Sequence, residues 1–141
     1  MIDLSPLIER ITSQVPALKL VGGAARFEEA QEGIKTLPAA FALLARESPD
    51  PSPFMDQLVQ QRIVVDFVVL VACRNLSDAS GKAAAETMQP VRHAIRQALL
   101  KWAPDAEHDG CEFVNGEMLD FVNKVLWWQD TYRTAYMIRS D

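Results

Sequence analysis

Cysteine is scarce in this chain, which has only two, Cys73 and Cys111, among its 141 residues. That number is too small for a disulfide framework, although one disulfide between the two stays an open alternative. Cys73 lies in an apolar pattern, where a free cysteine behaves as a small hydrophobic side chain. The N-terminal stretch MIDLSPLIER has no basic region followed by a long apolar run, so it is not typical of a signal peptide. We therefore expect a reducing cytoplasm as the compartment.

An excess of basic charge is also missing, because 14 Lys and Arg stand against 19 Asp and Glu, for a net charge of −5. Nucleic-acid-binding proteins usually present a basic face, so this balance argues against general affinity for nucleic acid and for solubility. The apolar and charged fractions, 49% and 23%, are ordinary for a globular protein. A chain of this length buries roughly two thirds of its unfolded surface, and we expect residues 1–141 to form a single domain.

Long hydrophobic runs are absent as well. The densest apolar stretch is RIVVDFVVLVACR, residues 62–74, and its longest uninterrupted run covers only residues 67–73. A membrane-spanning helix needs about 20 apolar residues, so this sequence predicts no membrane helix there. Its many β-branched side chains favour a strand instead, and an unusually long one.

Periodicity and turn signals divide the remaining chain into helices and strands. For the first helix, we expect Ser5 to be the cap and Pro6 the first helical residue. A proline-rich loop, ESPDPSPF, links two strands into a long hairpin. In chain order we expect a helix over 4–15, a short strand over 17–21, a helix over 24–33, strands over 39–46 and 59–74, a helix over 79–102, and strands in the last third.

The long helix and the strands of the last third each contain a feature that allows a more specific prediction. Pro90 lies inside the apolar stripe of the long helix, so we expect either a kink or two helices that meet end to end. Asn115-Gly116 is a strong signal for a two-residue hairpin turn. A helix over 118–125 is an alternative, and the change of apolar parity at Trp127–Trp128 indicates a bulge.

Consecutive strands dominate this order. The predicted fold class is therefore α+β, with a largely antiparallel sheet, a long central hairpin, and one long helix and short helices packed on it.

Motifs that would carry chemistry are weak. The segment EHDGCE, residues 107–112, gathers metal-ligand residue types, but a zinc site usually needs a second spaced group. Arg92, His93 and Arg96 are interpreted as a solvated basic face of the long helix. We therefore predict no catalytic residues, no cofactor and no metal, and we expect that the protein is not an enzyme. The alternatives are a cytosolic small-molecule or metal-binding α+β domain that uses the EHDGCE segment, and a monomeric accessory domain.

The long strand leaves one question open. Its odd-numbered residues from Ile63 to Cys73 form one apolar face that must be core. The other face is mixed, with Asp66 between Val64 and Val68. Either the protein's own helices or another subunit covers its apolar band, since exposed patches of this kind often mark association surfaces.

Taken together, these elements resemble the tail terminator proteins of tailed bacteriophages and prophages. The resemblance covers nearly the whole chain and rests on the order LKLVGGAARFEEA, LPAAFALLA, the proline-rich loop, the valine-rich strand, CRNLSDASGKAAAETMQPVRHAIRQALLKWAP, CEFVNGEML and WWQDTYRTAYMIR.

The resemblance implies a structural role in the virion tail, after assembly in the bacterial host cytoplasm. Such proteins form a ring, typically a hexamer, that caps the head-proximal end of the tail tube and stops its polymerisation. The implied partners are further copies of the chain, the tail tube protein and a head-completion or connector protein. DNA would pass through the lumen without specific binding, and no membrane is involved. We expect the assembly interface to include Pro49, Pro51, Pro53, Phe54, Arg62, Asp66, Arg74, Asn75 and Asp78.

Overall fold

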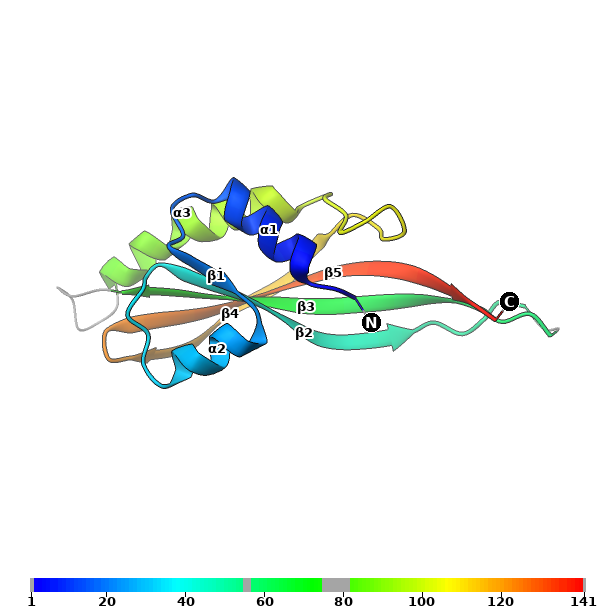
Figure 1. The fold of residues 1–141 in the computed structure, drawn as a ribbon, viewed down its shortest axis with the longest axis horizontal. Coiled ribbons are helices and arrows are strands. Elements are labelled where there is room, and N and C mark those ends of the chain that lie inside the picture. The colour runs from blue at the N-terminus through cyan, green and yellow to red at the C-terminus, as the bar shows by residue number, and fades with distance from the viewer. Residues whose placement is uncertain (1, 55–56, 75–81, 141) are drawn as a thin grey trace.

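The computed structural model describes residues 2–54, 57–74 and 82–140, and it contains one mixed sheet with helices on both faces (Figure 1). The strands are in the order β1-β2-β3-β5-β4, with β1 parallel to β2 and the other three pairs antiparallel. The predicted α+β class is confirmed. The elements are α1 Ser5–Gln14, β1 Leu20–Gly22, α2 Ala24–Gln31, β2 Ala39–Pro49, β3 Gln60–Arg74, α3 Lys82–Leu99, β4 Glu112–Val122 and β5 Val125–Arg139.

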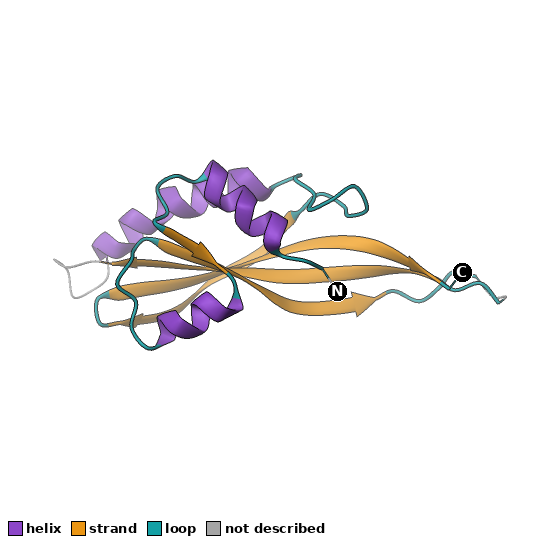
Figure 2. Cartoon of the chain, in the orientation of Figure 1, coloured by secondary structure: helices purple, strands orange, loops and turns teal. Residues whose placement is uncertain are grey.

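The helices cover only part of the sheet. Figure 2 shows α1 and α3 on one face and α2 on the other, while β2, β3 and β5 run on beyond all three helices. We call this projecting part the arm and define it as residues 46–49, 60–66 and 133–139. At least one face of the arm is free of helix, so its surface is open to other molecules.

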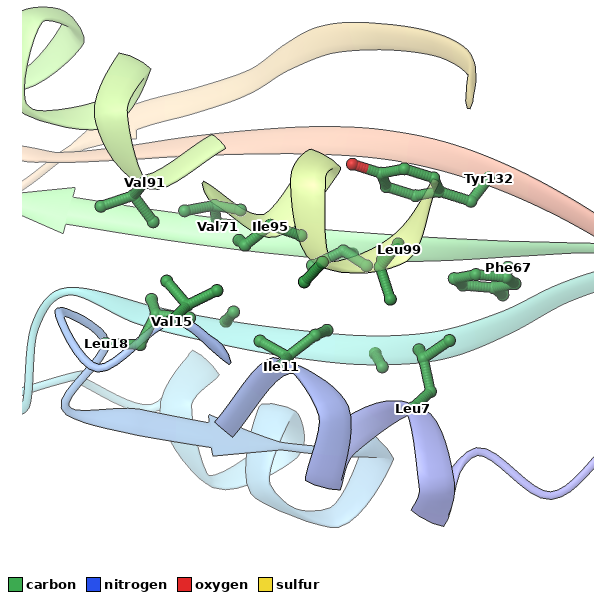
Figure 3. Close-up of a cluster of buried hydrophobic side chains, with 14 of the residues drawn as sticks. Leu7, Ile11, Val15, Leu18, Phe67, Val71, Val91, Ile95, Leu99 and Tyr132 are labelled. Atoms are coloured by element: carbon green, nitrogen blue, oxygen red, sulfur yellow. The ribbon is translucent and has the colours of Figure 1, made fainter. Parts of the chain in front are cut away.

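The main core lies between the sheet and the pair α1–α3, as Figure 3 shows. Leu7 and Ile11 of α1 meet Ile95 and Leu99 of α3, and these four side chains are fully buried. Each contributes about 1.5–3 kcal/mol through burial. The predicted cap is wrong, because Ser5 is the first helical residue and its backbone N–H donates to Asp3 Oδ1 at 3.0 Å.

A second core lies under α2 and shows what covers one half of the mixed face of β3. Phe27 packs against Phe41 and Trp127, with ring centroids 5.7 and 5.9 Å apart. Val68 and Leu70, from the mixed face of β3, belong to the same cluster. The chain's own helix thus covers this half of the mixed face, while Asp66 and Val64 lie in the arm.

The hairpin turn of the last third is not at Asn115-Gly116, which lies inside β4. The β4–β5 turn is Asn123-Lys124, with φ of 53° and 60°, between the paired residues Val122 and Val125. Positive φ at both central residues is what a two-residue type I′ turn requires. Asparagine adopts that conformation readily, so the true turn carried a signal of its own.

Three further expectations are corrected. Pro90 lies within one continuous helix, so two helices meeting end to end is wrong. Residues 118–122 are strand, so the helical alternative is wrong too. β5 pairs with β3 in unbroken register past Trp127 and Trp128, so the bulge expected there is not in β5. It lies on the partner strand directly across from them, between Met118 and Asp120 of β4. Further bulges lie between Phe113 and Asn115 of β4 and between Leu44 and Arg46 of β2. Among the described residues, no helix is both long enough and apolar enough to cross a membrane.

Candidate assembly surfaces

The proline-rich loop forms one end of the molecule, beyond the arm. The backbone N–H of Asp50 donates to the Arg62 carbonyl at 2.8 Å, and Ser52 Oγ accepts the Gln60 N–H at 3.2 Å. Pro49, Pro51 and Pro53 are all exposed, and Phe54 is 45% exposed. The base of the loop is therefore hydrogen-bonded to β3, and its tip exposes the aromatic side chain of Phe54.

Asp66 lies in a row of alternating charge across the open face of the arm. Arg133 donates to it twice, from Nε to Oδ1 at 2.7 Å and from Nη2 to Oδ2 at 3.2 Å. Asp66 raises the pKa of Arg133, first through this hydrogen bond and then through its charge. The register places Arg46 across from Asp66 on β2, and Glu112 across from Arg133 on β4. Four strands thus present the signs plus, minus, plus and minus at one level.

The structure gives Arg62 and Arg74 internal partners, although both are exposed. Arg62 Nη2 donates to Asp109 Oδ2 at 3.0 Å, and Arg62 Nη1 is 3.9 Å from Asp50 Oδ2. Arg74 Nη2 donates to the carbonyl of Ile34 at 3.1 Å. These two arginines lie at opposite ends of β3, so the predicted interface residues do not form one patch. Asn75 and Asp78 lie outside the described residues.

The EHDGCE segment does not bring its ligand types together. Cys111 is buried in the main core, where burial raises the pKa of its thiol to about 12. The His108 ring lies on Tyr136, 5.2 Å between centroids, and its Nδ1 is 2.6 Å from Asp105 Oδ1. Among the described residues, no group of three or more His, Cys, Asp or Glu is placed to hold a metal ion.

A buried ion pair joins α3 to β5, and the sequence interpretation missed it. Arg92 Nη2 and Nε donate to Asp130 at 2.7 and 2.9 Å, and Trp128 Nε1 donates to the same carboxylate at 3.0 Å. The Arg92 guanidinium also lies over the Trp128 ring, 4.3 Å from its centroid. Only 1% of the Asp130 surface is exposed. We call Arg92, Asp130 and Trp128 the clamp.

Gly116 on β4 lies directly against the three side chains of the clamp. A Cβ added there would collide with Asp130 Oδ1 and would lie 2.8 Å from Arg92 Nη2 and 3.0 Å from Trp128 Nε1. Glycine is therefore needed for close approach and not for a turn.

The solvated-face interpretation is wrong for Arg92, which is buried, while His93 is exposed as expected. A signal was present, because Arg92 lies four residues after Met88 and seven before Leu99. It falls inside the apolar stripe, where a charged residue needs a buried partner.

Strand β4 is a second feature that the predictions did not include. It forms one edge of the sheet, and nine of its eleven residues are exposed. Exposed apolar side chains recur along it, at Val114, Met118, Leu119 and Val122, with Met118 58% exposed. A groove of about 530 Å³ lies between this strand and α2, lined in part by Leu119, Val122 and Phe27. An edge strand of this length with exposed apolar side chains offers unpaired backbone groups to which another strand can add.

Comparison with known proteins gives a family match over the whole chain. The sequence model of the family described as phage tail terminator protein matches residues 1–141. Among solved structures, one similar chain belongs to a structure described as the virion of a native gene transfer agent particle. The two chains share 17% sequence identity with a TM-score of 0.49, over 91% of this chain and 84% of that chain. No curated protein matches the sequence.

Proposed function

The chain belongs to the phage tail terminator family and is a structural protein of the phage tail, and from this premise we propose that it closes the head-proximal end of the tail tube. In this proposal, copies of the chain form a ring, a hexamer as the family resemblance implies. One side of the ring meets the last layer of tube protein and stops its polymerisation. The other side receives the head-completion or connector protein. Assembly takes place in the cytoplasm of the bacterial host.

The observation that carries this proposal, beside the family, is the arm. It projects past the helices, its tip presents Phe54, and its open face carries the charge row around Asp66 and Arg133. An isolated globular domain gains no stability from an extended strand surface that is exposed to water. A protein that caps a tube gains a rigid contact surface, because ordered strands lose little conformational freedom on binding.

The predicted interface residues take two places in this proposal. The loop at Pro49, Pro51, Pro53 and Phe54, with Arg62 and Asp66 on the arm, contacts a neighbouring protein at the arm end. Arg74 lies at the opposite end of β3 and contacts a different neighbour; Asn75 and Asp78, which follow it in the sequence, lie outside the described residues. Two separated contact regions are what a joint between tube and head requires.

The charge of the chain fits a DNA channel. The net charge is −5, and phosphate binding by basic side chains is what gives proteins sequence-independent affinity for DNA. A lumen lined by such a chain would let DNA pass without retaining it.

Deletion of the gene and electron microscopy of the resulting tails test the proposal. We expect tails of uncontrolled length that do not join to heads, and rescue by the wild-type gene. Phe54→Glu should fail to rescue, while Phe54→Leu should succeed. Normal tail lengths in the deletion strain would overturn the capping role.

A further inference from the structure

Both edges of the sheet have backbone groups that are not paired with another strand, and the two edges are formed by different strands. Strand β1 pairs with β2 only from Ala39 to Phe41. In the described part of the chain, no strand lies against the outer side of β2 from Ala42 to Arg46. At the other edge, β4 pairs with β5 alone. Each open edge presents backbone N–H and C=O groups that another strand can pair with.

We propose that the β4 edge of one copy pairs with the β2 edge of the next copy, at residues 42–46. This inference rests on the proposed ring, and it names the contact that closes it. Because the two edges are different surfaces, the contact is heterologous, which is the kind that generates rings.

The strand directions fit this pairing. From β2 through β3 and β5 to β4 the neighbouring strands are antiparallel, so β4 runs opposite to β2. A copy in nearly the same orientation therefore presents β2 antiparallel to β4, and the sheet would continue across the boundary with the same alternation. Closing a sheet in this way requires a stagger between neighbouring strands.

Both edges also carry apolar surface. Met118 and Leu119 project from β4 and are 58% and 46% exposed. A groove of about 470 Å³ lies against the β2 edge, between Leu43 and the N-terminal residues Ile2 and Leu4. Through Trp128 and Val71 the register sets Met118 level with Ala40, so a stagger of five residues brings it to Ala45 and places the β4 apolar side chains against this groove. Burying them there removes apolar surface from water on both copies.

Charge favours the same partner. β4 carries three exposed carboxylates, at Glu112, Glu117 and Asp120. Arg46 lies on the β2 edge, and Arg26 is the exposed third residue of α2, whose first residue lines the groove. Opposite charges across the boundary favour β4 against β2, whereas β4 against β4 would place carboxylates together.

Site-directed cross-linking of the full-length protein tests the pairing. Met118→Cys and Ala45→Cys place thiols on the two edges at exposed positions, while the native cysteines Cys73 and Cys111 are buried. With a short bismaleimide, the double variant should give a ladder of covalent multimers. Each single variant should give monomer only, and an equimolar mixture of the two single variants should give dimer and nothing larger.

A matched control replaces Met118→Cys by Glu86→Cys, which is exposed on α3, in combination with Ala45→Cys. Its multimer yield should be at least tenfold lower. The experiment is run on free protein from micromolar to millimolar concentration and on purified tails. No ladder from the double variant in either sample would overturn the pairing. Cross-linking of the Met118→Cys variant with itself would also overturn it, because that result requires a two-fold contact through β4.

The experiments distinguish an error in the proposed strand pairing from an error in the proposed capping role. Rings seen by light scattering or electron microscopy without the Met118–Ala45 cross-link would exclude the strand pairing and leave the cap intact. As a second measurement, Leu119→Glu should lower the population of rings at least tenfold, while Leu119→Met should leave it unchanged. Equal ring populations in both variants would count against the β4 edge.

Discussion

Replacing Asp130 by Asn tests whether the clamp holds the last two strands to the long helix. The substitution keeps the shape of the side chain and removes its charge. Asp130 accepts three hydrogen bonds, two from Arg92 and one from Trp128, and it is 1% exposed. Breaking a buried ion pair by removing one partner leaves an uncompensated charge and costs about 3–5 kcal/mol. We expect a loss of that size in the free energy of unfolding.

Urea unfolding measures this loss directly. With a slope of about 2 kcal/mol per molar urea, a loss of about 4 kcal/mol lowers the midpoint by roughly 2 M. The thermal midpoint should fall by roughly 10 °C for a chain of this size. Such a change is large against a total stability of about 5–15 kcal/mol.

Asp66→Asn is the matched control, since Asp66 also accepts hydrogen bonds from the Nε and Nη2 of one arginine, Arg133, at 2.7 and 3.2 Å. The side chains of Arg133 and Asp66 are 40% and 18% exposed, so water screens this pair, and its loss should cost about 0–1 kcal/mol. Equal costs for the two Asp→Asn variants would refute the argument that burial decides the strength of the clamp.

Three further predictions concern stability. Gly116→Ala should cost about 1–3 kcal/mol by overpacking the clamp, while Asn115→Ala next to it should change the urea midpoint by less than a third as much. Lys124→Gly should raise the free energy of unfolding by roughly 0.5–1 kcal/mol, because lysine is disfavoured at its φ of 60°; an unchanged midpoint would contradict the assigned turn. Burial raises the thiol pKa from 9.0 to about 11 for Cys73 and about 12 for Cys111, so the folded state keeps protons that the unfolded state releases. The stabilisation is full below pH 9 and is lost as pH rises through 11, and a urea midpoint that does not fall between pH 8 and pH 10.5 would argue against the buried thiols.

The fold class was predictable because burial imposes periodicity on the sequence. Ile95 and Leu99 mark the helix stripe, and the odd residues of β3 mark the core face, so both elements were assigned near their observed bounds. Strand pairs then follow from order along the chain. None of this requires knowledge of contacts between distant residues.

The clamp was not predictable in the same way. A glycine meets either of two needs, a positive φ or the absence of a Cβ, and the sequence Asn115-Gly116 does not distinguish them. Only the contact with Asp130 and Arg92, residues far along the chain, shows that the second need applies. The place of Arg92 in the apolar stripe indicated burial, but its partner lies 38 positions later and could not be identified from the sequence.

The sequence indicated that the face of β3 around Asp66 is partly apolar, but it could not predict which part of that face the chain's own helices cover. Alternation showed that Val68 and Asp66 point the same way, but the position of α2 decides which of them is covered. The helix begins at Ala24, beside residues 42–44, and runs away from the arm, so Val68 is core and Asp66 faces outward.

The clamp lies directly against Gly116 of β4, the strand that also forms the open edge, and this arrangement has a physical reason. Nine of the eleven residues of β4 are exposed, so apolar burial alone holds the strand weakly. Gly116 lets the buried Arg92–Asp130 pair lie directly against its backbone, which fixes β4 without covering its outer side. A strand held in this way is ordered before it meets a partner, and the entropic cost of association falls accordingly. Asp130→Asn should therefore weaken association between copies even under conditions where the monomer stays folded, and light scattering at 10 °C would measure it; association equal to that of the wild type would separate the clamp from assembly.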